Sequence, residues 1–349
     1  MKKVSLFFCL LIASLLMLAG CNDNSEKKAQ DAGKKLTIVT TIYPEYAWVK
    51  EILGNRMGAV DLKLLIKGGV DLHSFQPSAM DIATIGKSDL VVFVGGESDE
   101  WIKKVFEAAP NGKRVALNLM EMLGEKVKQE EIVEGMEHHH EHGEEHDDDH
   151  HEDDHHEHAE EHEHHHHEEV EYDEHVWLSL NNAATLVGKI AEALAGIDAA
   201  NAETYKANAA AYVAKIRELE TQYRSATDSA ARKVILFGDR FPFRYLVDDY
   251  GIKYYAAFVG CSAESEASFE TVAFLANKMD SLALPAIFTI ENSNGKIAKT
   301  VLEASKKSKN AQELTMNSMQ SVTEQQIKDG ADYLSIMREN LEVLKKAIQ

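Results

Sequence analysis

The sequence predicts an α/β protein with two lobes that are joined by a long helix. Segments with strand and helix patterns alternate in the first and last thirds of the chain, which is typical of parallel sheets covered by helices. Between them, residues 199–230 contain neither Pro nor Gly and repeat large apolar side chains at helical spacing: Tyr205, Tyr212, Ile216, Leu219 and Tyr223. With 349 residues, the chain is long enough for each lobe to bury a core of its own.

The first lobe is expected to span residues 36–197. It opens with a strand at 36–41 and a helix at 44–53, for which Pro44 suits the first turn and Gly54 the C-terminal cap. A second strand at 60–66 leads into a loop at 67–77. After a short helix, a third strand at 90–94 ends at two glycines, and a later helix begins near residue 179 or 181 and runs through 195.

The linking helix is assigned to residues 198–230 and the second lobe to residues 231–349. In this lobe, 234–237 and 286–290 are expected to form strands, an amphipathic pattern predicts a helix over 269–282, and a last helix spans 324–347. Loops that follow the strands of such sheets are where ligands usually bind. A site built from both lobes is therefore expected in the cleft between them.

Residues 137–169 interrupt the first lobe with fifteen His, sixteen Asp or Glu, one Gly and one Ala. This His-rich run has no apolar side chain larger than Ala, so it cannot bury a core and is expected to be a disordered loop. It accounts for most of the formal net charge of −21, because the rest of the chain carries −5 once the sixteen acids are set aside. The chain has no basic stripe, which argues against nucleic acid as a partner.

Residues 1–20 are expected to be a signal peptide, because a positively charged start precedes an apolar run that is short for a membrane span of about 20 residues. The run ends in Leu-Ala-Gly-Cys, which resembles the lipobox of bacterial lipoproteins. The resemblance implies cleavage before Cys21, acylation of Cys21, and residues 21–35 as a lipidated tether. A plain signal anchor is the alternative. Only Cys261 lies in the folded part, so no internal disulfide is expected there.

Two of the seventeen His lie in the expected lobes. His73 stands in Asp-Leu-His-Ser-Phe-Gln-Pro (71–77), and His175 stands in Asp-Glu-His-Val-Trp-Leu-Ser (173–179). These segments resemble the ligand motifs Asp-Pro-His-x-[Tyr/Phe]-x-Pro and Asp-Pro-His-x-Trp-Leu of the metal-binding lipoproteins of zinc and manganese ABC importers, with Leu72 and Glu174 in place of the prolines. The resemblance covers residues 36–349. It implies a linking helix that restricts lobe motion and explains the His-rich run between the two ligand histidines.

The resemblance also implies two ligands from the second lobe. Glu291, which follows the strand at 286–290, matches the acidic ligand of the family. The family's other ligand is usually His or Glu, but an ungapped match over residues 237–246 puts Arg240 at its position. A guanidinium has no lone pair to offer a cation. Asp239 is the expected substitute, while a capping or Arg-paired role for Asp239, and water in the shell, stay open.

Cys261, Glu264 and Glu266 are left outside the expected site. A thiolate binds zinc well, yet a lone Cys is more often a small buried hydrophobic residue. Glu266 suits the cap of the helix that begins near Ser268.

The resemblance implies an extracytoplasmic receptor, anchored to the membrane through Cys21, that captures Zn²⁺ and delivers it to an ABC importer permease with a separate ATPase. Two His and two carboxylates also suit Mn²⁺, whereas Ca²⁺ and Mg²⁺ prefer oxygen ligands alone. The His-rich run favours zinc, and nickel and copper stay open. We expect a monomer and no catalysed reaction. A surface zinc buffer or adhesin without transport, and a zinc hydrolase, are the rival interpretations.

The His-rich run contains strings such as His-Glu-Asp-Asp-His (151–155), which match a zinc-protease pattern. A run composed almost only of His and acids yields such strings by chance, and the protease motif needs a packed helix. We expect weak collection of metal by these imidazoles, with a solvated spacer as the alternative. The imidazoles are His138, His139, His140, His142, His146, His150, His151, His155, His156, His158, His162, His164, His165, His166 and His167.

Overall fold

A computed structural model describes residues 35–136, 171–262 and 266–349. The first lobe contains a four-stranded parallel sheet in the order β2-β1-β3-β4, formed by β1 (Leu36–Thr40), β2 (Val60–Leu64), β3 (Leu90–Phe93) and β4 (Val115–Asn118). Every residue of the central strand β3 is buried, as expected for a parallel strand covered on both faces. The helices of this lobe are α3 (Tyr43–Leu53), α4 (Ala79–Lys87), α5 (Trp101–Ala108) and α6 (Leu119–Leu123).

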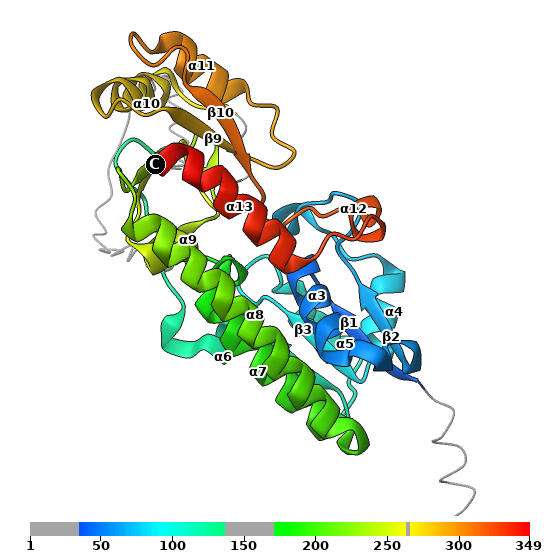
Figure 1. Cartoon of the computed structure of the whole chain (residues 1–349). Coiled ribbons are helices and arrows are strands. Elements are labelled where there is room, and N and C mark those ends of the chain that lie inside the picture. Colours follow the sequence, from blue (N-terminus) through cyan, green and yellow to red (C-terminus); the bar gives the residue numbers. More distant parts are fainter. Residues whose placement is uncertain (1–34, 137–170, 263–265) are drawn as a thin grey trace, which may run out of the picture.

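The second lobe is also built on parallel strands. β9 (Ala286–Ile290) pairs with β10 (Gln312–Met316), β5 (Val234–Leu236) pairs with β7 (Lys253–Tyr255), and an isolated bridge between Phe237 and Phe288 joins the two pairs. A short parallel pair, β6 (Arg240–Phe241) and β8 (Phe258–Val259), lies beyond the ends of β5 and β7. The helices of this part of the chain are α9 (Arg244–Tyr250), α10 (Phe269–Ser281), α11 (Lys296–Ala304), α12 (Glu324–Lys328) and α13 (Tyr333–Ile348). Of these, α12 lies beside the first lobe, where Glu324 pairs with Lys67 at 3.1 Å (Figure 1).

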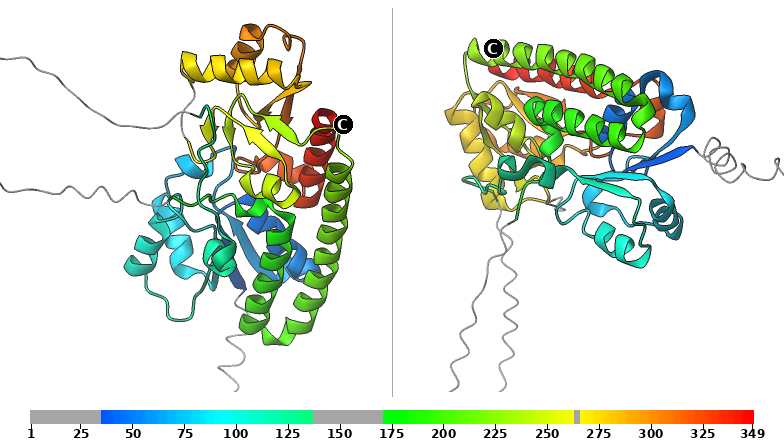
Figure 2. Two further views of the ribbon diagram at one scale, coloured as in Figure 1. Left: turned by 90° about the vertical axis from the view of Figure 1, so that its left-hand side faces the viewer. Right: turned by 90° about the horizontal axis from the view of Figure 1, so that it is seen from below.

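Two long helices pack against each other, and one of them connects the lobes. α7 (Leu180–Ile197) begins at the capping hydroxyl of Ser179 and packs along α8 (Ala202–Asp228), which reaches from one lobe to the other (Figures 1 and 2). The apolar positions expected on the linking helix are all buried, and the Tyr223 hydroxyl donates to the Met337 carbonyl of α13 at 2.6 Å. The α/β architecture with a long helix between the lobes is therefore confirmed.

The expectation of a single helix over 324–347 is wrong. The chain forms α12 and α13 with a turn between them, because Gly330 adopts a positive φ of 93° that ends the first helix. Asp332 then caps α13 through bonds from the backbone N–H groups of Leu334 and Ser335. Several elements were not expected, among them α5, β4, α9, α11 and β10. Each has nine residues or fewer, so it offers too few repeats of an apolar pattern to be recognised from sequence.

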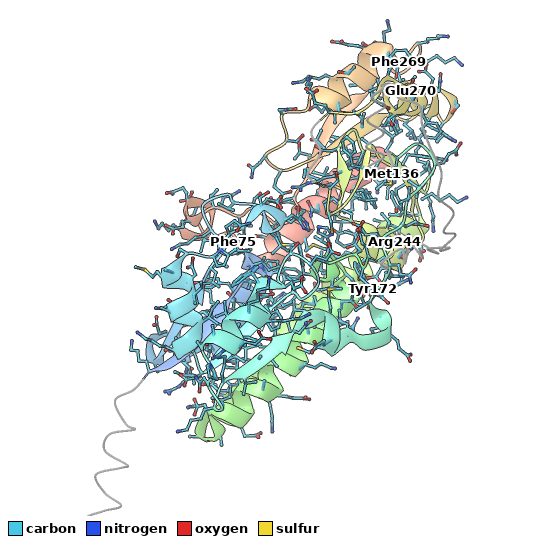
Figure 3. The ribbon with its side chains drawn as sticks, turned by 180° about the vertical axis from the view of Figure 1, so that it is seen from behind. Phe75, Met136, Tyr172, Arg244, Phe269 and Glu270 are labelled. Atoms are coloured by element: carbon cyan, nitrogen blue, oxygen red, sulfur yellow. The ribbon has the colours of Figure 1, made fainter. Side chains whose placement is uncertain are left out.

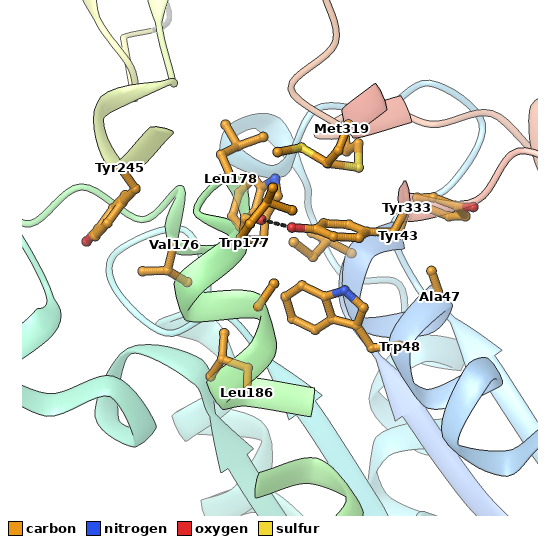
Figure 4. Close-up of a cluster of buried hydrophobic side chains, with 14 of the residues drawn as sticks. Tyr43, Ala47, Trp48, Val176, Trp177, Leu178, Leu186, Tyr245, Met319 and Tyr333 are labelled. Carbon is orange, nitrogen blue, oxygen red and sulfur yellow. Dashed lines mark hydrogen bonds between the residues drawn. The ribbon is translucent and has the colours of Figure 1, made fainter. Parts of the chain in front are cut away.

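A core shared by the lobes fixes the segment that carries His175. Trp177 is fully buried, its indole N–H donates to the Ser318 carbonyl at 2.8 Å, and its own carbonyl accepts from the Tyr333 hydroxyl at 2.7 Å. Trp48 of α3 packs edge-on against Tyr333, with ring centroids 5.3 Å apart (Figure 4). The segment after His175 is thus tied to the first lobe, to α13 and to the loop after β10.

Residues 128–136 leave the first lobe and lie against the second. Glu131 pairs with Arg244 of α9, and Glu134 accepts from Lys278 of α10 at 2.9 Å. Figure 3 shows Met136 among the side chains of the second lobe, well away from Phe75 of the His73 loop. Of the helices that the structure describes, none is long and apolar enough to span a bilayer.

Candidate metal centre

His73 lies in a 3₁₀ turn, Leu72–Ser74, in the loop between β2 and α4. The carboxylate of Asp71 caps this turn by accepting from the His73 N–H at 3.0 Å. The imidazole Nδ1 lies 2.7 Å from the Ser98 hydroxyl, which follows β3. With Nδ1 engaged by this hydroxyl, the Nε2 lone pair is free to point into the site.

His175 directly precedes a 3₁₀ turn, Val176–Leu178, and is fully buried. One carboxylate oxygen of Asp173 accepts two hydrogen bonds from His175, one from the backbone N–H at 2.8 Å and one from Nδ1 at 2.9 Å. The Tyr245 hydroxyl donates to the Asp173 carbonyl at 2.8 Å and so ties this segment to the second lobe. A carboxylate on Nδ1 is the usual outer partner of a metal-binding histidine, because it fixes the ring and makes Nε2 more basic.

The two imidazoles present their Nε2 atoms to one another at 3.3 Å, with ring centroids 5.3 Å apart. Two imidazole nitrogens bound to one tetrahedral Zn²⁺ at about 2.0–2.1 Å lie about 3.3–3.4 Å apart. Burial, and then the neighbouring His175, lower the pKa of His73 to about 3. The His73 ring is therefore neutral near pH 7, which is the state that binds a metal.

The side-chain amide of Gln320 occupies the point where the two imidazoles meet. Its Nε2 lies 2.9 Å from Nε2 of His73 and is also in contact with Nε2 of His175. Gln320 is 2% exposed and belongs to the loop after β10. A metal held by both imidazoles would displace this amide or turn its oxygen toward the ion.

Glu291 and Asp239 line a cavity together with Arg240 and with Asp71 and Ser74 of the His73 loop. The Glu291 carboxylate accepts from the N–H and hydroxyl of Ser318, at 2.6 and 2.7 Å, and burial raises the pKa of Glu291. Asp239 accepts from the Arg240 N–H at 2.9 Å. Both acids thus have oxygens engaged by protein donors, and neither shares the group of closely spaced potential ligands that contains the two His.

Arg240 forms a contact between the lobes. Its guanidinium pairs with Asp71, two residues before His73, and also donates to the Ser262 carbonyl at 3.3 Å. Burial alone would raise the pKa of Asp71, but the Arg240 guanidinium beside it lowers this pKa overall. Arg240, which stands at the position expected for a metal ligand, therefore joins Asp71 of the first lobe to the loop of Ser262 in the second lobe.

Cys261, and neither predicted acid, belongs to a group of potential ligands with the two imidazoles. Among the described His, Cys, Asp and Glu residues, the potential metal ligands grouped within 4.8 Å of one another are His73, His175 and Cys261. The Cys261 N–H donates to the Glu130 carboxylate at 3.2 Å. Burial, and then the carboxylate of Glu130, raise the pKa of the Cys261 thiol well above its usual range.

Backbone conformation marks the same region. Asn292, which follows Glu291, and Met319, which precedes Gln320, adopt positive φ angles of 61° and 62°. Such conformations are costly for non-glycine residues and cluster at functional sites.

The structure shows three features that the sequence analysis missed: the position of Gln320, the Arg240–Asp71 contact, and the closeness of Cys261 to the imidazoles. Gln320 lies in the loop that follows the parallel strand β10, and such loops commonly bind ligands. The sequence analysis did not predict β10, so it gave no reason to single out this loop.

The remaining predicted residues fall into two groups. Glu266 is exposed and pairs with Lys296 at 2.6 Å, so it is not part of the His pair's surroundings. Cys21, Glu264 and the fifteen His of the His-rich run lie outside the described residues.

Comparison with known proteins agrees with the α/β fold with a long helix. The family model ZnuA, described as zinc-uptake complex component A, periplasmic, matches residues 38–347. The zinc-binding lipoprotein AdcA of Streptococcus pneumoniae is 31% identical over 350 residues, which cover 99% of this chain and 61% of the relative. The high-affinity zinc uptake system protein ZnuA of Bacillus subtilis is 30% identical over 348 residues, which cover 99% of this chain and 98% of the relative.

A solved structure shares the fold. The Zn(II)-bound ZnuA-like domain of Streptococcus pneumoniae AdcA superposes with a TM-score of 0.65 at 26% identity, covering 90% of this chain and 99% of that domain. The chain spans about 60% of the length of the AdcA proteins that it matches. Because the family model covers nearly all of the described residues and both lobes, the chain belongs to the ZnuA family.

Proposed function

We propose that this protein is an extracytoplasmic receptor that binds Zn²⁺ in the cleft between its lobes and delivers it to an ABC importer permease, whose energy comes from a separate ATPase. The observation that carries the proposal is the buried pair of imidazoles, with Nε2 atoms 3.3 Å apart and each Nδ1 engaged by another side chain. This is the separation of two ligands on one tetrahedral zinc ion. The names of the AdcA and ZnuA relatives support zinc as the ion.

In this proposal His73 and His175 hold the ion from the first lobe. Asp239 and Glu291 form the acidic wall on the second-lobe side, from which a carboxylate completes the coordination. Imidazole and carboxylate together suit zinc better than calcium or magnesium. The protein binds and releases its cargo without a chemical reaction.

Anchoring through Cys21 would keep this receptor at the membrane surface, near the permease. The support is the lipobox-like sequence before Cys21 and the lipoprotein name of the pneumococcal relative. We propose that the receptor acts as a monomer.

The His-rich run, residues 137–169, is proposed to collect zinc weakly and raise its concentration near the cleft. Deletion of 137–169 should leave one tight zinc equivalent and remove several weak ones. Calorimetric titration of the full-length and shortened proteins measures both classes. An unchanged total stoichiometry would contradict a collecting role.

Zinc uptake by whole cells tests the transport proposal. In the source organism with this gene deleted, the intact gene should restore uptake of radioactive zinc under zinc limitation. His73→Ala and His175→Ala should fail to do so at equal protein levels, whereas Gly188→Ala, in a helix position with open space around it, should restore uptake. A protein that binds zinc tightly but does not affect uptake would be a buffer or adhesin, and metal-dependent turnover of a substrate would indicate a hydrolase.

A further inference from the structure

We infer that Cys261 supplies the third protein ligand of the metal site, as a thiolate from the second lobe. This inference rests on the proposed function, because it names a ligand of the same site. The donor atoms of His73, His175 and Cys261 all lie within 4.8 Å of one another. Two buried imidazoles and a thiol around one point form a ligand cluster, in which Cys261 is the member that comes from the second lobe.

The distances suit a zinc site that closes slightly around the ion. With Zn–S near 2.3 Å and Zn–N near 2.0–2.1 Å, a sulfur and a nitrogen on one tetrahedral zinc lie about 3.6 Å apart. The Cys261 sulfur, within 4.8 Å of both imidazole donor atoms, therefore has to approach by about 1.2 Å at most. Rotation about the Cα–Cβ bond of Cys261, or a small shift of its loop, supplies this movement.

The loop of Cys261 is held against His175 by close packing. A Cβ added at Gly260 would lie 2.9 Å from Cε1 of His175 and 2.9 Å from the carbonyl oxygen of Phe241. Any residue larger than glycine would push the loop away from the imidazole, because the carbonyl is backbone and cannot give way cheaply. Glycine at this position therefore brings the following Cys261 to the ligand cluster.

Two polar contacts hold the loop on either side of Cys261. The Cys261 N–H donates to the Glu130 carboxylate at 3.2 Å, and the Ser262 carbonyl accepts from Arg240 at 3.3 Å. Arg240 also pairs with Asp71 beside His73. Arg240 is thus a positioning residue that joins the Cys261 loop to the His73 loop.

An independent feature of the same cavity points to a cation. Glu174, which precedes His175, lines a cavity with His73, Cys261 and Glu130 and is 2% exposed. Its Oε1 accepts from the Ser98 N–H at 2.9 Å, whereas its Oε2 lies 4.0 Å from Nδ1 of His73 and has no hydrogen-bond partner among the described residues. A buried carboxylate oxygen without a partner is costly, and a cation bound beside His73 would offset that cost.

Binding exchanges one proton for one metal ion at the sulfur. The S–H bond breaks, the proton passes to solvent, and the sulfur lone pair forms the bond to Zn²⁺, so no oxidant or reductant is needed. Thiolate ligands favour zinc over manganese. A ligand set of two His, one Cys and one carboxylate would therefore select zinc, whereas two His with two carboxylates would also suit manganese.

The test uses the full chain loaded with Co²⁺, which reports a thiolate ligand through a charge-transfer band in the near ultraviolet. The wild type should show this band, Cys261→Ser should lose it, and Cys21→Ser, as the matched control, should keep it. Zinc affinity of Cys261→Ser, measured against a chromophoric chelator, should fall at least by the roughly 10- to 100-fold that loss of an outer partner typically costs. Manganese affinity should fall less.

The outcomes separate the ligand assignment from the proposed function. One Co²⁺ bound in dependence on His73 and His175, but without a thiolate band in the wild type, would overturn the role of Cys261 and leave the receptor proposal standing. The same holds if the band survives in Cys261→Ser. If no Co²⁺ or Zn²⁺ is bound in dependence on either His, both proposals fail. The wild-type spectrum alone decides the assignment if Cys261→Ser does not fold.

Discussion

The carboxylate of Asp173 offers a quantitative test of the His pair, because it contacts His175 without belonging to the proposed ligand set. One of its oxygens accepts from both the N–H and the Nδ1 of His175, at 2.8 and 2.9 Å. In Asp173→Asn the amide oxygen can still accept these bonds, so the ring keeps its place. The negative charge that makes Nε2 a stronger ligand is lost.

Loss of an outer partner of a metal-binding histidine typically weakens metal affinity by about 10- to 100-fold. This corresponds to about 1.4–2.8 kcal/mol of binding free energy. We expect Asp173→Asn near the lower end of this range, because the amide oxygen remains. Asp173→Ala should reach the upper end and also lose about 1–3 kcal/mol of folding stability, since the buried His175 N–H is left without its acceptor.

Competition titration with a zinc chelator measures the affinities, and urea denaturation of the metal-free proteins measures their stability. Asp249→Asn is a matched control, because Asp249 accepts from the Ser179 hydroxyl at 2.6 Å on the neighbouring helix start and does not contact His175. Its zinc affinity should equal that of the wild type. Wild-type zinc affinity in both Asp173 variants would refute the role of His175 as a ligand.

Three further predictions concern the surroundings of the pair. Arg240→Met should weaken zinc binding about 10-fold and destabilise the protein by about 1–3 kcal/mol, because the largely buried Asp71 loses its partner. Lys296→Met, which removes an exposed ion pair, should leave stability and zinc binding nearly unchanged. Gly260→Ala should lower both zinc affinity and stability, whereas Gly188→Ala should stabilise helix α7 by about 0.5–1 kcal/mol. If the two variants had the same stability and the same zinc affinity, the close packing of Gly260 on His175 would be contradicted. Burial raises the pKa of Asp99 to about 7 in the folded protein. Between about pH 4 and pH 7 the folded protein keeps a proton that the unfolded chain releases, so the contribution of Asp99 to stability is fully present below about pH 4 and is lost as the pH rises through 7. The unfolding free energy of the wild type, minus that of Asp99→Asn, should therefore fall between about pH 4 and pH 8, and a flat or rising difference would refute this ionisation.

Much of the fold could be predicted from regular patterns. The buried strands β1, β3 and β9 have nearly continuous apolar sequences, and helix α8 repeats its large apolar residues over 27 positions without Gly or Pro. Strand β10 reads Gln-Glu-Leu-Thr-Met and is exposed along most of its length, so it has no such pattern. Its absence from the prediction concealed the loop that carries Gln320.

The part of the candidate site that lies in short, recognisable sequence segments could be predicted. His73 and His175 stand in recognisable segments, and the structure brings their Nε2 atoms together. The contribution of the second lobe depended on contacts between segments distant in the chain. The closeness of Cys261 to the imidazoles arises from its contact with Glu130, 131 residues away in sequence, and from the bond between Arg240 and Ser262. Such pairings are set by packing of the lobes and leave no periodic signal in the sequence.

The most direct measurement of the central claim is the zinc content and zinc titration of the protein without residues 1–21 and 137–169. Mass spectrometry of the purified protein and chelator competition should show one tightly bound zinc ion, and manganese should bind more weakly. The tight site should be absent in both His73→Ala and His175→Ala. Retention of one tight zinc equivalent in both variants would contradict a cleft site built on the two imidazoles.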